Sequence, residues 1–334
     1  MDTAISPGRA PAPGNLRRRA RAAAFALSLL VAFPARAADA PSARGAASVP
    51  TARRPAPADV VRFLEQATMG PTEALVAHVT AVGLERFLEE QLAAPPSGYP
   101  DLPPMPRDQQ TGCPEGSPAT CVRDNYSMYP LQVRFFQNAL KNDDQVRQRV
   151  ALALHEILVV SGVKLRQPSI VGPYLDMLQR NALGSYRTLL ADLTLSPAMG
   201  FYLDMVDNAA AAPPANVPPD ENYARELLQL FSVGVFLLNE DGTPVRDPEG
   251  RPVPAYGQET IRSFARVFTG FTYATFPGAS PRRNNPPNFK APMWLYRNAA
   301  GLDAAHDKGA KTLLDYPGAV QATLPANQDG AVDL

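Results

Sequence analysis

Apolar residues recur at helical spacing through most of the chain, and the clearest example is the segment from Pro219 to Gly234. Its apolar residues fall at positions i, i+3, i+4 and i+7, namely Ala224, Leu227, Leu228 and Phe231. Its polar residues lie on the opposite face at the same spacing, namely Asn222, Arg225, Glu226 and Gln229. The pattern predicts an amphipathic helix with one stripe in the core. Asp220 stands just before it, where a carboxylate can cap the exposed backbone amides.

The same periodicity predicts that most of the chain is helical. The segment QVRQRVALALHEILVV should be central to the core, with Val146, Val150, Leu154, Ile157 and Leu158 facing inward. From 234 to 256 the apolar positions flank Asp241-Gly242, which predicts a β-hairpin. The 36 prolines in 334 residues indicate long loops. We therefore predict a mainly α fold: a multi-helix orthogonal bundle with one β-hairpin excursion (about 234–256) and long Pro-rich loops.

The N-terminal region has a different pattern. Residues 1–37 combine a basic segment, Arg17 to Arg21, with an apolar run from Ala22 to Phe33 and the small residues Ala35 and Ala37. This order is typical of a signal peptide cleaved near Ala37, and the apolar run is shorter than the roughly 20 residues that span a bilayer. The Ala, Pro, Ser and Arg composition of residues 38–57 predicts a flexible linker. Residues 58–334 are predicted to form the folded domain. We expect a periplasmic or secreted protein without a transmembrane segment, exported by a Sec or Tat route.

Charge and cysteine content narrow the class of protein. The whole chain has 32 basic and 32 acidic side chains. Cleavage after residue 37 would remove six arginines and Asp2, which leaves 26 basic and 31 acidic side chains. A mildly acidic surface without a basic stripe disfavours nucleic acid as a partner. The two cysteines, Cys113 and Cys121, bracket the loop CPEGSPATC. In an oxidising compartment this spacing favours a short disulfide, because a metal site would need two more ligands nearby.

Several sequence blocks occur in an order that resembles one bacterial protein family. They are RFLEQATMGPT, RQRVALALHEILVVS, NALGSYRTLLADLTLSPAMGFYL, DENYARELLQLFSVGV, YGQETIRSFARVFTGFTY and HDKGAKTLL. Over roughly residues 60–334 the series resembles the DUF1800 family. The resemblance implies an exported, mainly helical protein without an established activity, and a sulfatase-like exported partner protein whose gene lies nearby. Relatives continue beyond the last block, so we expect this chain to lack the family's C-terminal part.

The polar face of the 219–234 helix and the block HDKGAK supply a candidate site. We predict Glu226, His306 and Arg225 as catalytic residues, and Asn222, Glu221, Asp307 and Lys311 as binding residues. A half-buried Glu226 could act as a base or metal ligand, and Arg225 could hold an anionic group. The alternative is a structural ion-pair network that ties the helix to Arg262 or Arg266.

The sequence leaves cofactor and function open. Four acids form a cluster that could hold a divalent cation such as Ca²⁺, or a solvated acidic surface, namely Asp204, Asp207, Asp220 and Glu221. The motifs GxSxG, HExxH, GxGxxG and the P-loop are absent from the sequence. Three hypotheses remain: an accessory or binding partner in cell-envelope or extracellular polymer processing, a hydrolase-like or metal-assisted enzyme, and a structural envelope protein. The enzyme hypothesis requires one polar pocket formed by Asn222, Arg225, Glu226 and His306.

Overall fold

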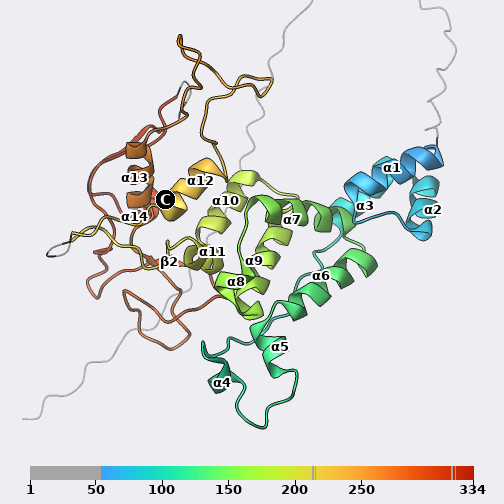
Figure 1. The fold of residues 1–334 in the computed structure, drawn as a ribbon, viewed down its shortest axis with the longest axis horizontal. Helices are drawn as coiled ribbons and strands as arrows, with labels where there is room; N and C mark the ends of the chain where they lie inside the picture. The colour runs from blue at the N-terminus through green and yellow to red at the C-terminus, as the bar shows by residue number, and fades with distance from the viewer. Residues whose placement is uncertain (1–53, 213, 215, 317–318, 320) are drawn as a thin grey trace, which may run out of the picture. The chain divides into compact units, whose positions relative to one another are not determined.

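The computed structural model of the protein describes residues 54–212, 214, 216–316, 319 and 321–334 (Figure 1). The predicted signal peptide, its cleavage near Ala37 and most of the predicted linker lie outside the described residues. The first described helix, α1, begins at Pro57. Among the helices in the described ranges, none combines the length and the hydropathy that a bilayer crossing requires.

The first three described helices pack around a small apolar core of their own. They are α1 (Pro57–Ala67), α2 (Glu73–Val82) and α3 (Leu84–Ala93). Their buried apolar residues are Val60, Leu64, Val79 and Phe87. The Thr72 hydroxyl caps α2 by accepting from the Leu75 amide at 3.2 Å. Gly83 has a φ of 89°, a conformation that glycine adopts readily, and this lets the chain turn directly into α3.

The predicted disulfide between Cys113 and Cys121 is confirmed. It closes the loop between two short helices, α4 (Gln109–Gly112) and α5 (Cys121–Tyr126), and α6 (Tyr129–Lys141) follows. The Tyr126 hydroxyl donates to the Pro106 carbonyl at 2.8 Å, so the loop is also held by a hydrogen bond to the preceding segment.

The main core lies between the helices in the middle of the chain (Figure 1). These are α7 (Gln145–Ile157), α8 (Gly162–Leu165), α9 (Pro168–Asn181), α10 (Tyr186–Thr194), α11 (Pro197–Tyr202), α12 (Asn222–Gln229) and α13 (Gln258–Val267). Helices α9 and α11 begin at Pro168 and Pro197, where the missing amide removes no hydrogen bond. Helix α9 packs against α7 and α10, and α12 packs against α13. The Tyr223 and Phe268 rings join the last pair edge to face, with centroids 5.0 Å apart.

Helix α7 is buried differently from the prediction. Leu158, just after it, is fully buried, but Ile157 is 49% exposed, so its predicted inward orientation is wrong. The buried residues within the helix are Gln145, Arg147, Gln148 and Ala151. Arg147 donates to the Gln179 carbonyl at 3.0 Å, and Gln148 donates to Asp144 at 2.9 Å. Polar side chains can occupy this face because their hydrogen bonds offset the cost of leaving water.

The predicted excursion from 234 to 256 contains short antiparallel pairings. Isolated bridges join Phe236 to Pro254, Leu238 to Pro244 and Arg246 to Pro252. Each bridge includes a proline, which lacks the amide that a continuous ladder needs, and this keeps the pairing short.

The rest of the chain adds two small sheets. Strand β1 (Phe271–Thr272) pairs antiparallel with β2 (Trp294–Leu295), and β3 (Lys311–Thr312) pairs antiparallel with β4 (Thr323–Leu324). A short helix, α14 (Gly330–Asp333), follows. The described fold is therefore mainly α with a hairpin excursion, as predicted.

Candidate functional site

Helix α12 has the predicted amphipathic character. Ala224 and Leu228 are each 1% exposed, and Phe231 is 2% exposed. Asp220 accepts a hydrogen bond from the Asn222 amide at 2.8 Å, so it binds the first amide of the helix, although the N-cap position itself is Glu221, whose side chain makes no cap hydrogen bond. The buried stripe fixes the rotation of the helix, and this turns its polar residues towards α13 and solvent.

Glu221, the N-cap residue of α12, is the residue through which α12 and α13 make most of their polar contacts. We call Glu221, Asn222, Arg225 and Glu226 the signature cluster. Arg225 Nη2 donates to Glu221 Oε2 at 2.8 Å, and Gln258 Nε2 donates to the same oxygen at 2.6 Å. Arg262 Nε lies 3.6 Å from Glu221 Oε1. Since Gln258 and Arg262 belong to α13, the structure contains the ion-pair network between the two helices that formed the alternative prediction.

The other members of the signature cluster have separate surroundings. Asn222 Nδ2 donates to Asp204 at 3.2 Å. Glu226 is partly buried. Its charge and that of Arg225 both influence the pKa of the nearby Tyr256. Burial raises the pKa of Tyr256, Arg225 opposes that rise, and Glu226 adds to it. The Tyr256 hydroxyl is buried and has no hydrogen-bond partner among the described residues.

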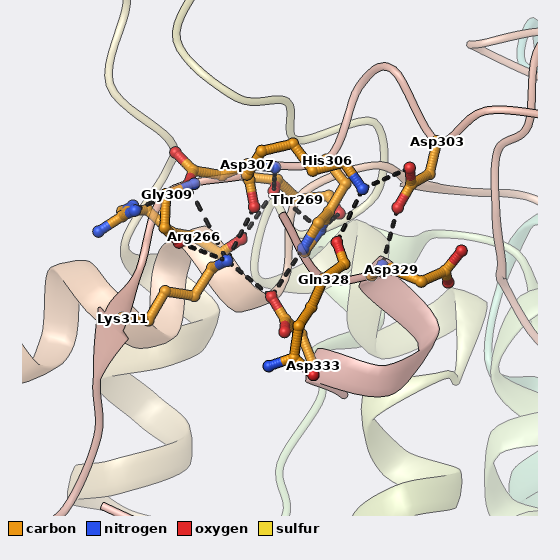
Figure 2. Close-up of polar contacts among 12 residues, drawn as sticks. Arg266, Thr269, Asp303, His306, Asp307, Gly309, Lys311, Gln328, Asp329 and Asp333 are labelled. Carbon is orange, nitrogen blue, oxygen red and sulfur yellow. Dashed lines mark hydrogen bonds and ion pairs between the residues drawn. The ribbon is translucent and has the colours of Figure 1, made fainter. Parts of the chain in front are cut away.

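A second polar cluster surrounds His306, close to the end of α13 (Figure 2). We call His306, Thr269, Lys311 and Asp333 the His306 cluster. The side chains of His306, Lys311 and Asp333 are 0%, 1% and 1% exposed. Their charged and titratable atoms are therefore enclosed by the protein.

Both ring nitrogens of His306 face oxygen acceptors. Nδ1 lies 2.9 Å from the Thr269 carbonyl oxygen, and Nε2 lies 2.9 Å from Asp333 Oδ2. A carbonyl oxygen only accepts, so Nδ1 carries a proton. A second proton has to lie between Nε2 and Asp333, on one atom or the other, for that contact to be a hydrogen bond. This is the arrangement of an enclosed His–Asp pair, and both of its partners are protein groups.

Lys311 completes the His306 cluster. Its ammonium donates to Asp333 Oδ2 at 2.6 Å, to the Asp307 carbonyl at 2.8 Å and to the Gly309 carbonyl at 3.1 Å. Three acceptors match the three protons of the ammonium group. Asp333 Oδ1 is buried without a hydrogen-bond partner among the described residues. Removing the Lys311 ammonium would leave the Asp333 side chain with His306 as its only hydrogen-bond partner among the described residues, and would take a donor from two backbone carbonyls.

Asp307 points to a different partner. It accepts from Arg266 Nη2 at 2.8 Å and from the Gly309 amide at 2.9 Å. Burial alone would raise the pKa of Asp307, but the hydrogen bonds from Arg266 and Gly309 and the nearby positive charges bring it below its ordinary value. His306 and Asp307 thus bind different groups, but they do not form the extended segment that was expected: the His306 amide donates to the Asp303 carbonyl at 2.9 Å, so His306 lies in a turn.

Two glycines make this close packing possible. A Cβ atom on Gly309 would lie 2.1 Å from Arg266 Nη2, and one on Gly330 would lie 2.7 Å from His306 Cγ. The glycine in the block HDKGAK, Gly309, therefore has a structural role, because it leaves room for the Arg266 guanidinium group that binds Asp307.

One stripe of α13 extends from the signature cluster to Asp307, the residue next to His306. Gln258 and Arg262 contact Glu221, and Arg266 contacts Asp307. These three residues follow one another at intervals of four, so they lie on one helix face, with successive residues about 6 Å apart along the axis. The signature cluster and the His306 cluster are therefore neighbours along α13, although each has its own partners.

The residues predicted to share one pocket lie outside the three best-defined cavities of the described residues. Three cavities are formed by other segments, with volumes of about 640, 600 and 150 Å³. Asn222, Arg225, Glu226 and His306 line none of these three.

The acids considered as cation ligands are each engaged separately. Asp204 pairs with Lys164 at 3.0 Å, Asp207 accepts from the Thr272 hydroxyl at 2.6 Å, and Glu221 pairs with Arg225. Within the described ranges, no group of three or more His, Cys, Asp or Glu side chains is arranged to hold a metal ion.

Three residues that complete these clusters were not predicted from the sequence. Asp333 and Thr269 provide the acceptors for His306, and Gln258 donates to Glu221. The i, i+4, i+8 spacing of Gln258, Arg262 and Arg266 is a signal that the sequence does carry. The contact with Asp333 has no local signal, because the two residues are 27 positions apart.

The fold and the two clusters define a mainly helical protein whose charged motif residues bind one another. The sequence profile of a family described as "Protein of unknown function (DUF1800)" matches residues 62–333. The chain belongs to the DUF1800 family. No curated protein and no solved structure matches it. The match does not test whether relatives have a C-terminal part that this chain lacks, so that expectation stays a prediction.

Proposed function

We propose that the chain is an exported accessory or binding protein in cell-envelope or extracellular polymer processing. The observation that carries this proposal is the enclosure of His306, whose side chain is 0% exposed and is held between Thr269 and Asp333. A general acid or base has to come within hydrogen-bond reach of its substrate, directly or through one water. An enclosed His–Asp–Lys cluster instead stabilises the segment that follows α13.

The signature cluster supports the same proposal. Glu221 and Arg225 form an ion pair, and Gln258 and Arg262 of α13 make further contacts with Glu221. These side chains join two helices, which is a sufficient reason for their charge and spacing. A binding protein presents surfaces and cavities on such a scaffold without requiring a reactive group in it.

Export is the second part of the proposal. The predicted signal peptide and the disulfide between Cys113 and Cys121 both agree with an oxidising compartment outside the cytosol. The family resemblance adds a sulfatase-like exported protein, encoded nearby, as the proposed partner.

The test uses the mature chain with and without that partner. The chain alone should turn over none of a panel of sulfate, phosphate, glycoside and carboxylic esters. It should form a complex of defined stoichiometry with the partner, measured by light scattering, and change the partner's rate on a polymeric substrate. Absence of both the complex and the rate effect would contradict the accessory role.

A matched pair of variants tests the enzyme alternative directly. Glu226→Gln removes the candidate base, and Glu240→Gln removes an exposed acid of the hairpin excursion. The proposal predicts no turnover for the unmodified chain, so neither variant changes it. Turnover by the chain alone that Glu226→Gln abolishes and Glu240→Gln preserves, with unfolding midpoints unchanged, would overturn the proposal.

A further inference from the structure

The largest of the three cavities lies between α6, α7 and α9, away from both charged clusters. Its volume is about 640 Å³, within the range of small-molecule sites. Apolar side chains form most of its wall, among them Leu131, Phe135, Leu152, Val171 and Leu175. Such a space is large enough for a ligand with a hydrocarbon chain or ring.

The cavity wall carries no formal charge. Among its 16 lining residues there is no Asp, Glu, Lys or Arg. The polar contributors are Tyr99, Gln132, Gln148, His155 and Gln179. Moving an ion from water into such a space is costly unless an opposite charge meets it. The lining therefore discriminates against ionic ligands.

Two of the polar residues are held uncharged and can bind a ligand. Burial lowers the pKa of His155, against the opposing effect of Glu156, so the ring is neutral at neutral pH. Its ring packs edge to face with Tyr174, with centroids 6.3 Å apart. Burial, with the negative charge of Asp176, raises the pKa of Tyr99 to about 12, so the hydroxyl keeps its proton.

Two of the three glutamines, Gln148 and Gln179, have protein partners and so form part of the rigid wall. Gln179 donates to Gln148 at 3.1 Å and accepts from the Gly98 amide at 2.9 Å. Gln148 in turn donates to Asp144 at 2.9 Å. These are the buried polar residues of α7 and α9 that the apolar periodicity did not predict, and they keep this side of the cavity in place.

The mouth of the cavity continues into an exposed apolar stripe on α6. Phe136 lines the cavity and is 60% exposed. Tyr129, Val133 and Leu140 are exposed at helical spacing around it. A ligand longer than the cavity can therefore extend over an apolar surface.

We infer that the α6/α7/α9 cavity binds an uncharged amphiphile, a molecule with a hydrocarbon body and one neutral hydrogen-bonding head such as a long-chain alcohol or ester. The apolar wall receives the hydrocarbon, and the Tyr99 hydroxyl and the His155 ring offer one donor and one acceptor for the head. The site lies on elements that carry none of the signature or His306 residues, so it goes beyond the accessory role proposed above.

The direct test is fluorescence titration of the mature chain with N-phenyl-1-naphthylamine, an uncharged apolar probe. Binding should saturate at one probe per chain. 1-Decanol should displace the probe at least tenfold more strongly than decanoate or decyltrimethylammonium, and 1-octanol more weakly than 1-decanol by about fourfold per methylene removed. The absence of saturable binding, or equal displacement by the ionic competitors, would overturn the inference.

A pair of alanines on α7 locates the site. Ala151 lines the cavity, whereas Ala153 is exposed on the same helix and does not line it. Ala151→Phe should abolish probe binding, and Ala153→Phe should leave it unchanged. Binding that survives a folded Ala151→Phe would place the ligand elsewhere.

A measurement on the unmodified chain covers the case in which Ala151→Phe does not fold. Diethyl pyrocarbonate modifies accessible imidazoles, and modification can be followed for each histidine by mass spectrometry. Saturating 1-decanol should slow the modification of His155 severalfold and leave that of the exposed His78 unchanged. Equal rates for His155 with and without 1-decanol would contradict occupation of this cavity.

Discussion

Lys311→Met gives the sharpest test of the role of the His306 cluster. The substitution keeps most of the length of the side chain and removes its charge. In the folded protein, Lys311 is 1% exposed and donates to Asp333 and to two backbone carbonyls. Without the ammonium, the 1% exposed Asp333 side chain keeps only its contact with His306, and the carbonyls of Asp307 and Gly309 lose their donor.

The expected magnitude follows from this burial. Removing one partner of a buried ion pair typically costs about 3–5 kcal/mol, because the remaining charge stays desolvated. An exposed pair contributes at most about 1 kcal/mol. The matched control is therefore Lys290→Met, since Lys290 pairs with Asp101 at the surface, where their side chains are 45% and 80% exposed.

Urea unfolding followed by circular dichroism measures both variants. Lys311→Met should lower the unfolding midpoint strongly with an unchanged slope, and Lys290→Met should shift it little. The double variant Lys311→Met/Asp333→Leu removes both charges and should be more stable than Lys311→Met alone. If Lys311→Met cost no more than Lys290→Met, the cluster would not be a structural ion network.

Three further outcomes follow from the described contacts. Replacing Cys113 and Cys121 together by serine should lower the free energy of unfolding by about 2–3 kcal/mol, measured in urea, because a short closed loop opens. Glu221→Gln should cost only about 0.5–1 kcal/mol by the same method, since its pair with Arg225 is partly exposed. Hydrogen bonds from Arg266 and Gly309 hold the pKa of Asp307 low in the folded state against the effect of burial, so its stabilisation is complete above the unfolded pKa of about 3.9 and is lost as pH falls through the folded value. Asp307→Asn should therefore lose less stability than the unmodified chain in urea titrations between about pH 5 and about pH 3.

Periodicity predicted the parts of the fold that depend on local order. Ala224, Leu228 and Phe231 are buried because residues at i, i+4 and i+7 share one face of a helix, whatever surrounds it. The hydrogen bond from the Asn222 amide to Asp220 and the disulfide between Cys113 and Cys121 are also local, and both are present.

Burial of polar residues in α7 could not be predicted in the same way. Arg147 is buried because the carbonyls of Gln179 and Ala94, 32 and 53 residues away, accept its protons. A pattern that counts only apolar positions assigns such a side chain to the surface. The energy that compensates its burial comes from partners that the local sequence does not contain.

The contacts around Glu221 could be predicted from the sequence, but the burial of His306 could not. The partners of Glu221 on α12 and α13 follow from helical spacing and opposite charge. The depth of His306 depends on Asp333, on the glycine at 330 and on the Thr269 carbonyl, which meet only in the folded chain. Nothing in the block HDKGAK alone indicates whether its histidine meets solvent.

The accessibility of His306 decides between a structural and a catalytic His306 cluster, because only an enclosed histidine is closed to a substrate. In diethyl pyrocarbonate labelling of the folded chain, His306 should be modified on the order of 10²-fold more slowly than His78, whose side chain is 46% exposed, since reagent reaches it only through local opening. In urea above the unfolding midpoint, the two histidines should react alike. Equal modification of His306 and His78 in the folded protein would rule out a purely structural role, because the His306 cluster would then be open to a substrate.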